Sequence, residues 1–192
     1  MDIKTIGEVY EEIKKELETE TDPQKKEELN RELNYLLETA KKELLRAEQA
    51  KQRDVFHRNY TRLEKIFGCD LSTVKRKQYL KLTAKPYMDL HVDILSRTET
   101  SFVLSMAHNY QQNGDAVPDP DMEIEIDLEN KTAEALTFQN SLIYSVVYDF
   151  DIHGVKIRVR PAVKKSLNSF LEMWTKNIIE QGHKIDKTKE AE

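Results

Sequence analysis

The strongest constraint on the fold is a change in hydrophobic spacing along the chain. From residue 3 to residue 67, apolar residues recur every three or four positions, which is the period of an amphipathic helix. From residue 77 they alternate with polar residues, as in a strand that has one solvated face. From residue 161 the helical spacing returns. This order of elements predicts an α+β fold.

Two helices are predicted in the first third of the chain. The apolar stripe of residues 3–17 predicts a helix that runs to about residue 20. A second helix should begin near Pro23, because proline is tolerated at the first helical position and Asp22 can accept hydrogen bonds from the first amides. Its stripe continues until Gly68 ends it, and the spacing leaves open whether residues 23–67 form one helix or two. These elements predict an N-terminal helical hairpin.

The apolar spacing of residues 3–67 allows two interpretations. In the first, the hairpin packs on itself or on the sheet, and its charged outer surface is solvated. In the second, it is a coiled-coil arm that dimerises or binds a partner, since two helices leave part of an apolar stripe without cover. A homodimer held through residues 1–54 is therefore one hypothesis for this protein.

The middle of the chain predicts an antiparallel meander of five or six strands. Residues 87–94 alternate apolar and polar side chains, and residues 122–128 do the same with Glu and Asp at the polar positions. Other strands are expected at residues 79–83, 101–108, 132–139, 142–148 and 155–159. A hairpin turn is expected at residues 129–131.

The C-terminal part predicts a helix that covers the sheet. Residues 161–181 have one apolar face, and Gly182 follows as a cap. This amphipathic helix is expected to cover the apolar face of the meander. The predicted domains are a helical arm at 1–54, an α+β domain at 55–183 and a polar tail at 184–192.

Composition excludes several classes of protein. Charged residues make up 34% of the chain, the mean hydropathy is -0.70, and no apolar run is long enough to cross a membrane. Cys69 is the single cysteine, which excludes an internal disulfide and a multi-cysteine zinc site. The first residues do not form a secretory signal, so we expect a cytoplasmic protein. Residues 69–154 contain seven basic and fourteen acidic residues, which argues against nucleic acid as the partner.

One segment, residues 108–121, predicts a binding site. It reads as a polar loop between two strands, and its groups can form hydrogen bonds or bind a metal. The candidate binding residues are His108, Tyr110, Asn113, Asp115, Asp119 and Asp121.

This predicted loop has two interpretations. In the first, Asn113 and Gly114 form a turn, the aspartates bond local amides, and no metal or cofactor binds. In the second, Asp115, Asp119 and Asp121 converge on a divalent cation, which prefers carboxylate oxygens. Pro118-Asp119 or Pro120-Asp121, followed by Glu129 and Lys131, also imitates the motif of a metal-dependent nuclease. The sequence assigns no catalytic residue.

Several blocks of the sequence resemble uncharacterised bacterial proteins. Val55-Phe-His-Arg-Asn-Tyr, the alternating strands and the block at 167–174 followed by Gly182 resemble YqiB-like proteins, which are classed as a domain of unknown function. The blocks at 107–115 and 119–123 look like related domains found in bacteria and on mobile elements. The resemblance covers about residues 55–182 and implies a shared fold without a known activity.

These observations favour a non-enzymatic interaction protein. An acidic sheet face with the 108–121 loop, or the helical arm, would contact another protein. With a mobile-element origin, the partner would belong to a host system that this protein inhibits or modulates. The alternatives are a metal-dependent hydrolase or nuclease that uses the loop aspartates, and a homodimeric structural protein held by the arm.

Overall fold

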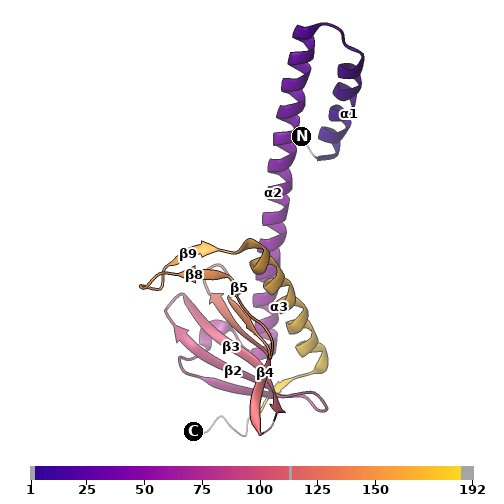
Figure 1. The fold of residues 1–192 in the computed structure, drawn as a ribbon. Coiled ribbons are helices and arrows are strands. Elements are labelled where there is room, and N and C mark those ends of the chain that lie inside the picture. Colours follow the sequence, from indigo (N-terminus) through magenta and orange to yellow (C-terminus); the bar gives the residue numbers. More distant parts are fainter. Residues whose placement is uncertain (1–2, 113, 187–192) are drawn as a thin grey trace. The chain divides into compact units, whose positions relative to one another are not determined.

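The computed structural model describes residues 3–112 and 114–186 (Figure 1). It divides the chain into two compact units, Met1–Arg53 and Asp54–Glu192. Helix α2 (Pro23–Phe67) contributes its first part to one unit and its last part to the other. The structure therefore answers the question left open by the spacing, because residues 23–67 form one helix.

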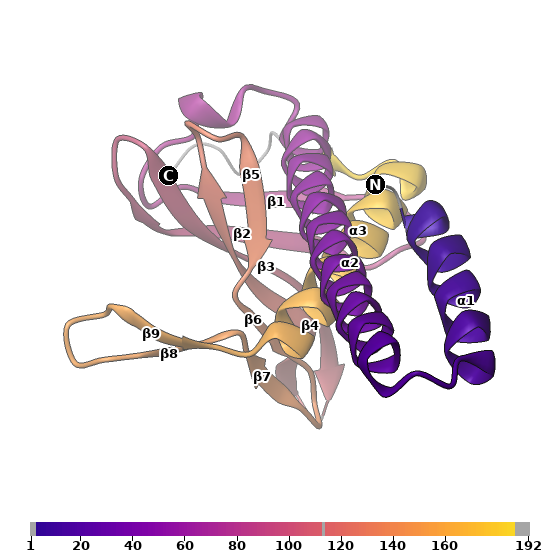
Figure 2. The ribbon, with the colours of Figure 1, turned by 90° about the horizontal axis from the view of Figure 1, so that it is seen from above.

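The first unit is the predicted helical hairpin. Helix α1 (Ile3–Thr19) lies antiparallel to the first part of α2, as Figures 1 and 2 show. The Asp22 carboxylate accepts a hydrogen bond from the Gln24 N–H at 2.9 Å, so Asp22 caps α2 as the sequence predicts. A single apolar seam joins the helices, and its buried members are Ile6, Ile13, Leu29, Leu33 and Leu36.

The second unit contains an eight-stranded antiparallel sheet. The strands follow the order β10-β1-β2-β3-β4-β6-β7, and β5 also pairs with β4. The strands of this main sheet are β1 (Tyr79–Thr83), β2 (Leu90–Arg97), β3 (Ser101–Gln112), β4 (Asp115–Asp127), β5 (Thr132–Ala135), β6 (Thr137–Gln139), β7 (Tyr144–Val146) and β10 (Lys184–Ile185). A separate two-stranded sheet consists of β8 (Tyr148–Phe150) and β9 (Lys156–Val159), and a short 3-10 helix, η1, spans Leu71–Thr73.

The structure has more strands than the five or six predicted, because two predicted strands are each divided by an inward-turning residue and a further strand follows the last helix. Leu136 interrupts residues 132–139, and its N–H donates to the Glu123 carbonyl at 2.8 Å. Val147 interrupts residues 142–148, and its N–H donates to the Leu136 carbonyl at 2.9 Å. Both residues are buried, so burial of these side chains sets the breaks.

The predicted polar tail also needs a correction. Gly182 has a φ of 76°, which reverses the chain after the last helix, and its N–H caps that helix. The chain then returns to the sheet, where Lys184 and Ile185 pair with β1 as strand β10. The Asp186 N–H donates to the Lys81 carbonyl at 2.8 Å. Residues 187–192 lie outside the described residues.

Two helices cover one face of the main sheet within the second unit (Figure 1). Helix α3 (Pro161–Gln181) provides Leu171 and Ile178, which are fully buried, and this confirms the covering helix that the sequence predicts. The last part of α2 adds a second cover, with Leu63 fully buried. The observed class is α+β, as predicted.

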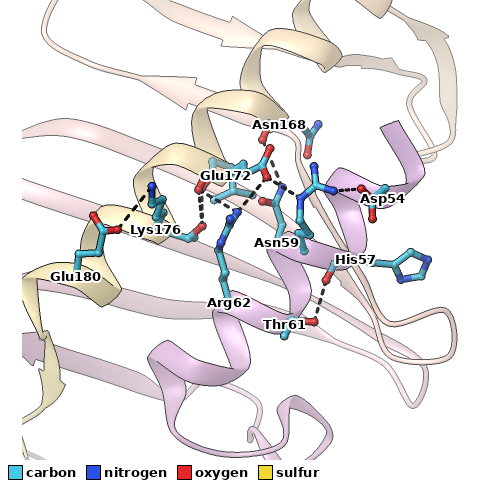
Figure 3. A network of polar contacts seen from close by, with 12 residues as sticks. Asp54, His57, Asn59, Thr61, Arg62, Asn168, Glu172, Lys176 and Glu180 are labelled. Atoms are coloured by element: carbon cyan, nitrogen blue, oxygen red, sulfur yellow. Dashed lines mark hydrogen bonds and ion pairs between the residues drawn. The ribbon is translucent and has the colours of Figure 1, made fainter. Parts of the chain in front are cut away.

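A polar network joins the last part of α2 to α3 (Figure 3). The Glu172 carboxylate lies 2.7 Å from Arg58 Nε and 3.3 Å from Arg62 Nη1. Hydrogen bonding to the Arg58 guanidinium lowers the pKa of Glu172. Deeper in the interface, Asn59 Nδ2 donates to the Asn168 carbonyl at 3.4 Å. These contacts fix the register of the two helices over the sheet.

Candidate protein-interaction surface

The segment at 108–121, predicted to be a polar loop, is a β-hairpin. Strand β3 continues to Gln112 and strand β4 begins at Asp115, so most of the segment is paired backbone. Gly114 has a φ of 90°, which suits the turn position that glycine favours. Asn113, a candidate binding residue, lies outside the described residues. The polar composition that predicted a loop instead reflects strands that extend past the buried core.

A β-bulge divides this hairpin into a base and a tip. Ala107 pairs with Asp121, whereas Asn109 pairs with Pro118. Three steps along β4 therefore match two steps along β3, so β4 contains one extra residue. Because side chains alternate between faces, the extra residue reverses the faces of β4 between base and tip.

The bulge separates the aspartates that were predicted to converge. By register, Asp121 lies on the outer face of the sheet, and its Oδ1 accepts a hydrogen bond from Ser105 Oγ at 2.8 Å. Asp115 lies on the opposite face, as does Tyr110, while Asp119 is exposed within the bulge. Across residues 3–112 and 114–186, no three His, Cys, Asp or Glu side chains are placed to hold a metal ion. The structure does not assemble the predicted cation site.

His108 lies in the core rather than on a binding surface. Its Nδ1 lies 3.0 Å from the Asp89 carbonyl, and its ring centroid lies 5.5 Å from that of Trp174 and 5.7 Å from that of His183. His183 Nε2 in turn lies 2.9 Å from the Met88 carbonyl. Burial lowers the pKa of His108, because desolvation disfavours the imidazolium. The two histidines hold the start of β2 against β3 and the end of α3, which is a structural role.

The outer face of the main sheet is acidic. Glu123, Glu125 and Asp127 alternate along β4 on this half-solvated face, as the sequence predicts. Nearby cations offset part of the charge, since Lys156 lies 2.5 Å from Glu125. A hollow of about 310 Å³ on this face is lined by Thr100, Ser101, Glu125, Asp127, Glu129, Thr132 and Glu134.

The exposed large apolar side chains of the second unit are most frequent in the segment that contains strands β7, β8 and β9. Figure 2 shows β8 and β9 extending beyond the main sheet. All four side chains of β9 are exposed, and Ile152, in the connection between β8 and β9, is 94% exposed. We call this region the β7–β9 surface, and its exposed members are Leu142, Ile143, Tyr144, Phe150, Ile152, Val155, Ile157 and Val159.

Polar contacts hold the β8–β9 hairpin in place. Arg160 Nη2 lies 2.6 Å from the Asp149 carboxylate, and the Arg160 N–H donates to the Val147 carbonyl at 2.9 Å. Lys156 Nζ lies 4.5 Å from the centroid of the Tyr148 ring. Because these contacts are polar or involve only one aromatic face, they anchor the hairpin without covering its apolar side chains.

A comparison with known families matches most of the chain to one family. The sequence profile described as a domain of unknown function, DUF6908, matches residues 58–184. The chain belongs to the DUF6908 family. The matched part begins in α2 and ends in β10, so the DUF6908 domain includes the main sheet, α3 and the β7–β9 surface. No curated protein and no solved structure matches the chain.

The first unit lies before the matched DUF6908 segment and has exposed apolar residues of its own. Leu37 is 41% exposed and Leu44 is 52% exposed. These residues are seven positions apart, so they lie on the same side of α2.

In the chain as described, residues 3–112 and 114–186, no helix is long and apolar enough to span a membrane.

Proposed function

We propose that this DUF6908 protein is a non-enzymatic interaction protein that binds another protein through the β7–β9 surface. One observation carries the proposal. Eight large apolar side chains within residues 142–159 are between 43% and 94% exposed. Exposed apolar side chains concentrated in this way are typical of protein-binding sites, whereas isolated ones are ordinary.

The finer version of the proposal concerns the partner. It is a protein of a host system that this protein inhibits or modulates, as its resemblance to domains on mobile elements suggests. The acidic outer face supports such a role, because ordered carboxylates would attract a partner with a basic surface.

The experiment compares two double variants of the full chain. Ile152→Ser with Ile157→Ser removes two exposed apolar side chains from the β7–β9 surface. Leu95→Ser with Met173→Ser removes two that are 48% and 51% exposed elsewhere in the same unit. We expect the wild type and the second variant to capture the same stoichiometric partner from lysate, and the first variant to bind it about tenfold more weakly or less.

Stability measurements make the result interpretable. All four replaced side chains are exposed, so the urea midpoints of both variants should stay close to that of the wild type. Equal capture of the partner by both double variants would remove the β7–β9 surface from the proposal.

A second candidate function is a homodimer held by the first unit. Exposed Leu37 and Leu44 favour it, because a second copy could cover both. Light scattering should give a dimer for the wild type and a monomer for Leu37→Glu with Leu44→Glu. Tyr35→Glu is the matched control, because Tyr35 is 71% exposed and lies on another side of α2. A wild-type mass equal to one chain would exclude this function.

A further inference from the structure

We infer that the partner docks by adding a β-strand to the free edge of β9, and that the added segment is extended, with alternating apolar and acidic residues. The inference rests on the proposed function, since it specifies how the β7–β9 surface would be used. Three observations support it: the backbone geometry of β9, the ion pairs that its basic side chains form, and the basic composition of residues 152–171.

Strand β9 has an unpaired edge. In the part of the chain that the structure describes, β8 and β9 form a sheet of two strands without a third. The Arg160 N–H donates to the Val147 carbonyl, so the backbone of Arg160 faces the β8 side. Backbone groups of successive residues in an antiparallel strand point alternately toward and away from the partner strand. The N–H and C=O of Val159 therefore point away from β8, toward the free edge.

The usual protections of a sheet edge lie before or after Val159 rather than at it. Natural edges are blunted by lysine, proline or a bulge. Lys156 is tied to Glu125 at 2.5 Å, so its charge is held on the molecule's own acidic face. The register shift of the hairpin places one extra residue, Ile157, in β9, whereas Val159 pairs regularly with Tyr148. Pro161 comes after the strand has ended. Val159 thus keeps an exposed side chain beside an available backbone donor.

The charge around β9 selects an acidic segment. Residues 152–171 contain five basic residues and no acidic residue. Three of the five pair with carboxylates from other segments, namely Lys156 with Glu125, Arg160 with Asp149 and Lys164 with Glu134. Arg158 is exposed on β9 itself. A carboxylate opposite Arg158 on an added strand would form a favourable cross-strand pair, whereas a lysine or arginine there would be repelled.

Strand addition also accounts for the apolar side chains. Main-chain hydrogen bonds to an added strand provide affinity, and alternate side chains provide specificity. An apolar residue of the added strand would cover Val159, which is 43% exposed. The same docking mode therefore satisfies an unpaired backbone edge and covers exposed apolar area.

The test uses a display library of random peptides of about twelve residues, selected on the full chain. Val159→Pro removes the outward N–H, and proline is tolerated on an edge strand at such a position. Val159→Thr keeps the N–H and the β-branched shape. Arg158→Glu reverses the charge on β9.

We expect selected peptides to alternate apolar with acidic residues. They should bind Val159→Thr within about threefold of the wild type and Val159→Pro about tenfold more weakly or less. Selection on Arg158→Glu should enrich basic peptides instead. Urea midpoints of the three variants, followed by Trp174 fluorescence, should match the wild type, which shows that the core is intact.

Other outcomes overturn the inference in distinguishable ways. Peptides that bind Val159→Pro as well as the wild type, but fail on the Ile152→Ser, Ile157→Ser variant, would retain the proposed surface and exclude strand addition. Self-association of the wild type that Val159→Pro removes would assign the edge to a second copy. Peptides whose binding depends on neither variant, or a selection without enrichment, would count against both proposals.

Discussion

Replacement of Asn168 tests the polar contact that joins α3 to the sheet. Asn168 is 1% exposed, its Oδ1 accepts a hydrogen bond from the Ala135 N–H at 3.0 Å, and its Nδ2 donates to the Lys164 carbonyl at 2.9 Å. Asn168→Ala leaves the Ala135 N–H buried without a partner. The Lys164 carbonyl keeps its helical hydrogen bond, so the loss is concentrated at Ala135.

The magnitude follows from two opposing effects. A buried unpaired N–H costs about 1–3 kcal/mol of unfolding free energy. Alanine is a better helix former than asparagine by about 0.6 kcal/mol, which offsets part of this cost. We expect Asn168→Ala to be destabilised by about 1–2 kcal/mol. Asn177→Ala is the matched control, because Asn177 is exposed on the same helix and its replacement has only the helix-forming effect.

Urea unfolding followed by the fluorescence of Trp174, the single tryptophan, measures both variants in the same unit. The difference between their unfolding free energies gives the cost of the unpaired N–H. It corresponds to a difference of about 1 M between the urea midpoints. Unfolding free energies of Asn168→Ala and Asn177→Ala that agree within about 0.3 kcal/mol would refute the reasoning.

Three further predictions concern pH and the cap of α3. Burial lowers the pKa of His108 below 6.5, so as the pH falls the unfolded chain binds the proton before the folded chain does. Stability should therefore be constant above about pH 7.5 and fall as the pH drops below 6.5. The difference between the urea midpoints at pH 7.5 and pH 5.5 should be smaller for His108→Gln than for the wild type. Because Arg58 lowers the pKa of Glu172 below 4.5, its contribution should be present above pH 4.5 and be lost at lower pH, and Glu172→Gln should lose this dependence. Gly182→Ala should cost about 1 kcal/mol in a urea titration at pH 7.5, because alanine is strained at a φ of 76°.

The sequence predicts the helix bounds closely because proline and glycine residues mark where the helices begin and end. Pro23 and Pro161 begin helices, and Gly68 and Gly182 follow their last residues. The strands are predicted less well, since a strand's alternation is local but its pairing is not. The bulge in β4 leaves the alternation of residues 122–128 intact and is defined only by the partner strand.

The candidate site shows the same limit. Ile157 on β9 and Leu82 on β1 both belong to short alternating segments. Leu82 is fully buried within the core of the second unit, whereas Ile157 is 64% exposed. Periodicity predicts that a strand has an apolar side, but not whether a helix covers it. Periodicity alone therefore does not reveal the β7–β9 surface, and the only sequence signal beside those strands is a run of basic residues.

The β4 bulge affects how freely the β3–β4 hairpin can vary in length. Residues 121–127 are held in register by buried side chains, whereas residues 115–118 lie beyond the bulge. An insertion or deletion of residue pairs in the tip would lengthen or shorten the hairpin without turning the base residues over. Within the DUF6908 family, we therefore expect differences in chain length to collect in the tip, and the spacing between the bulge and the turn after β4 to stay constant.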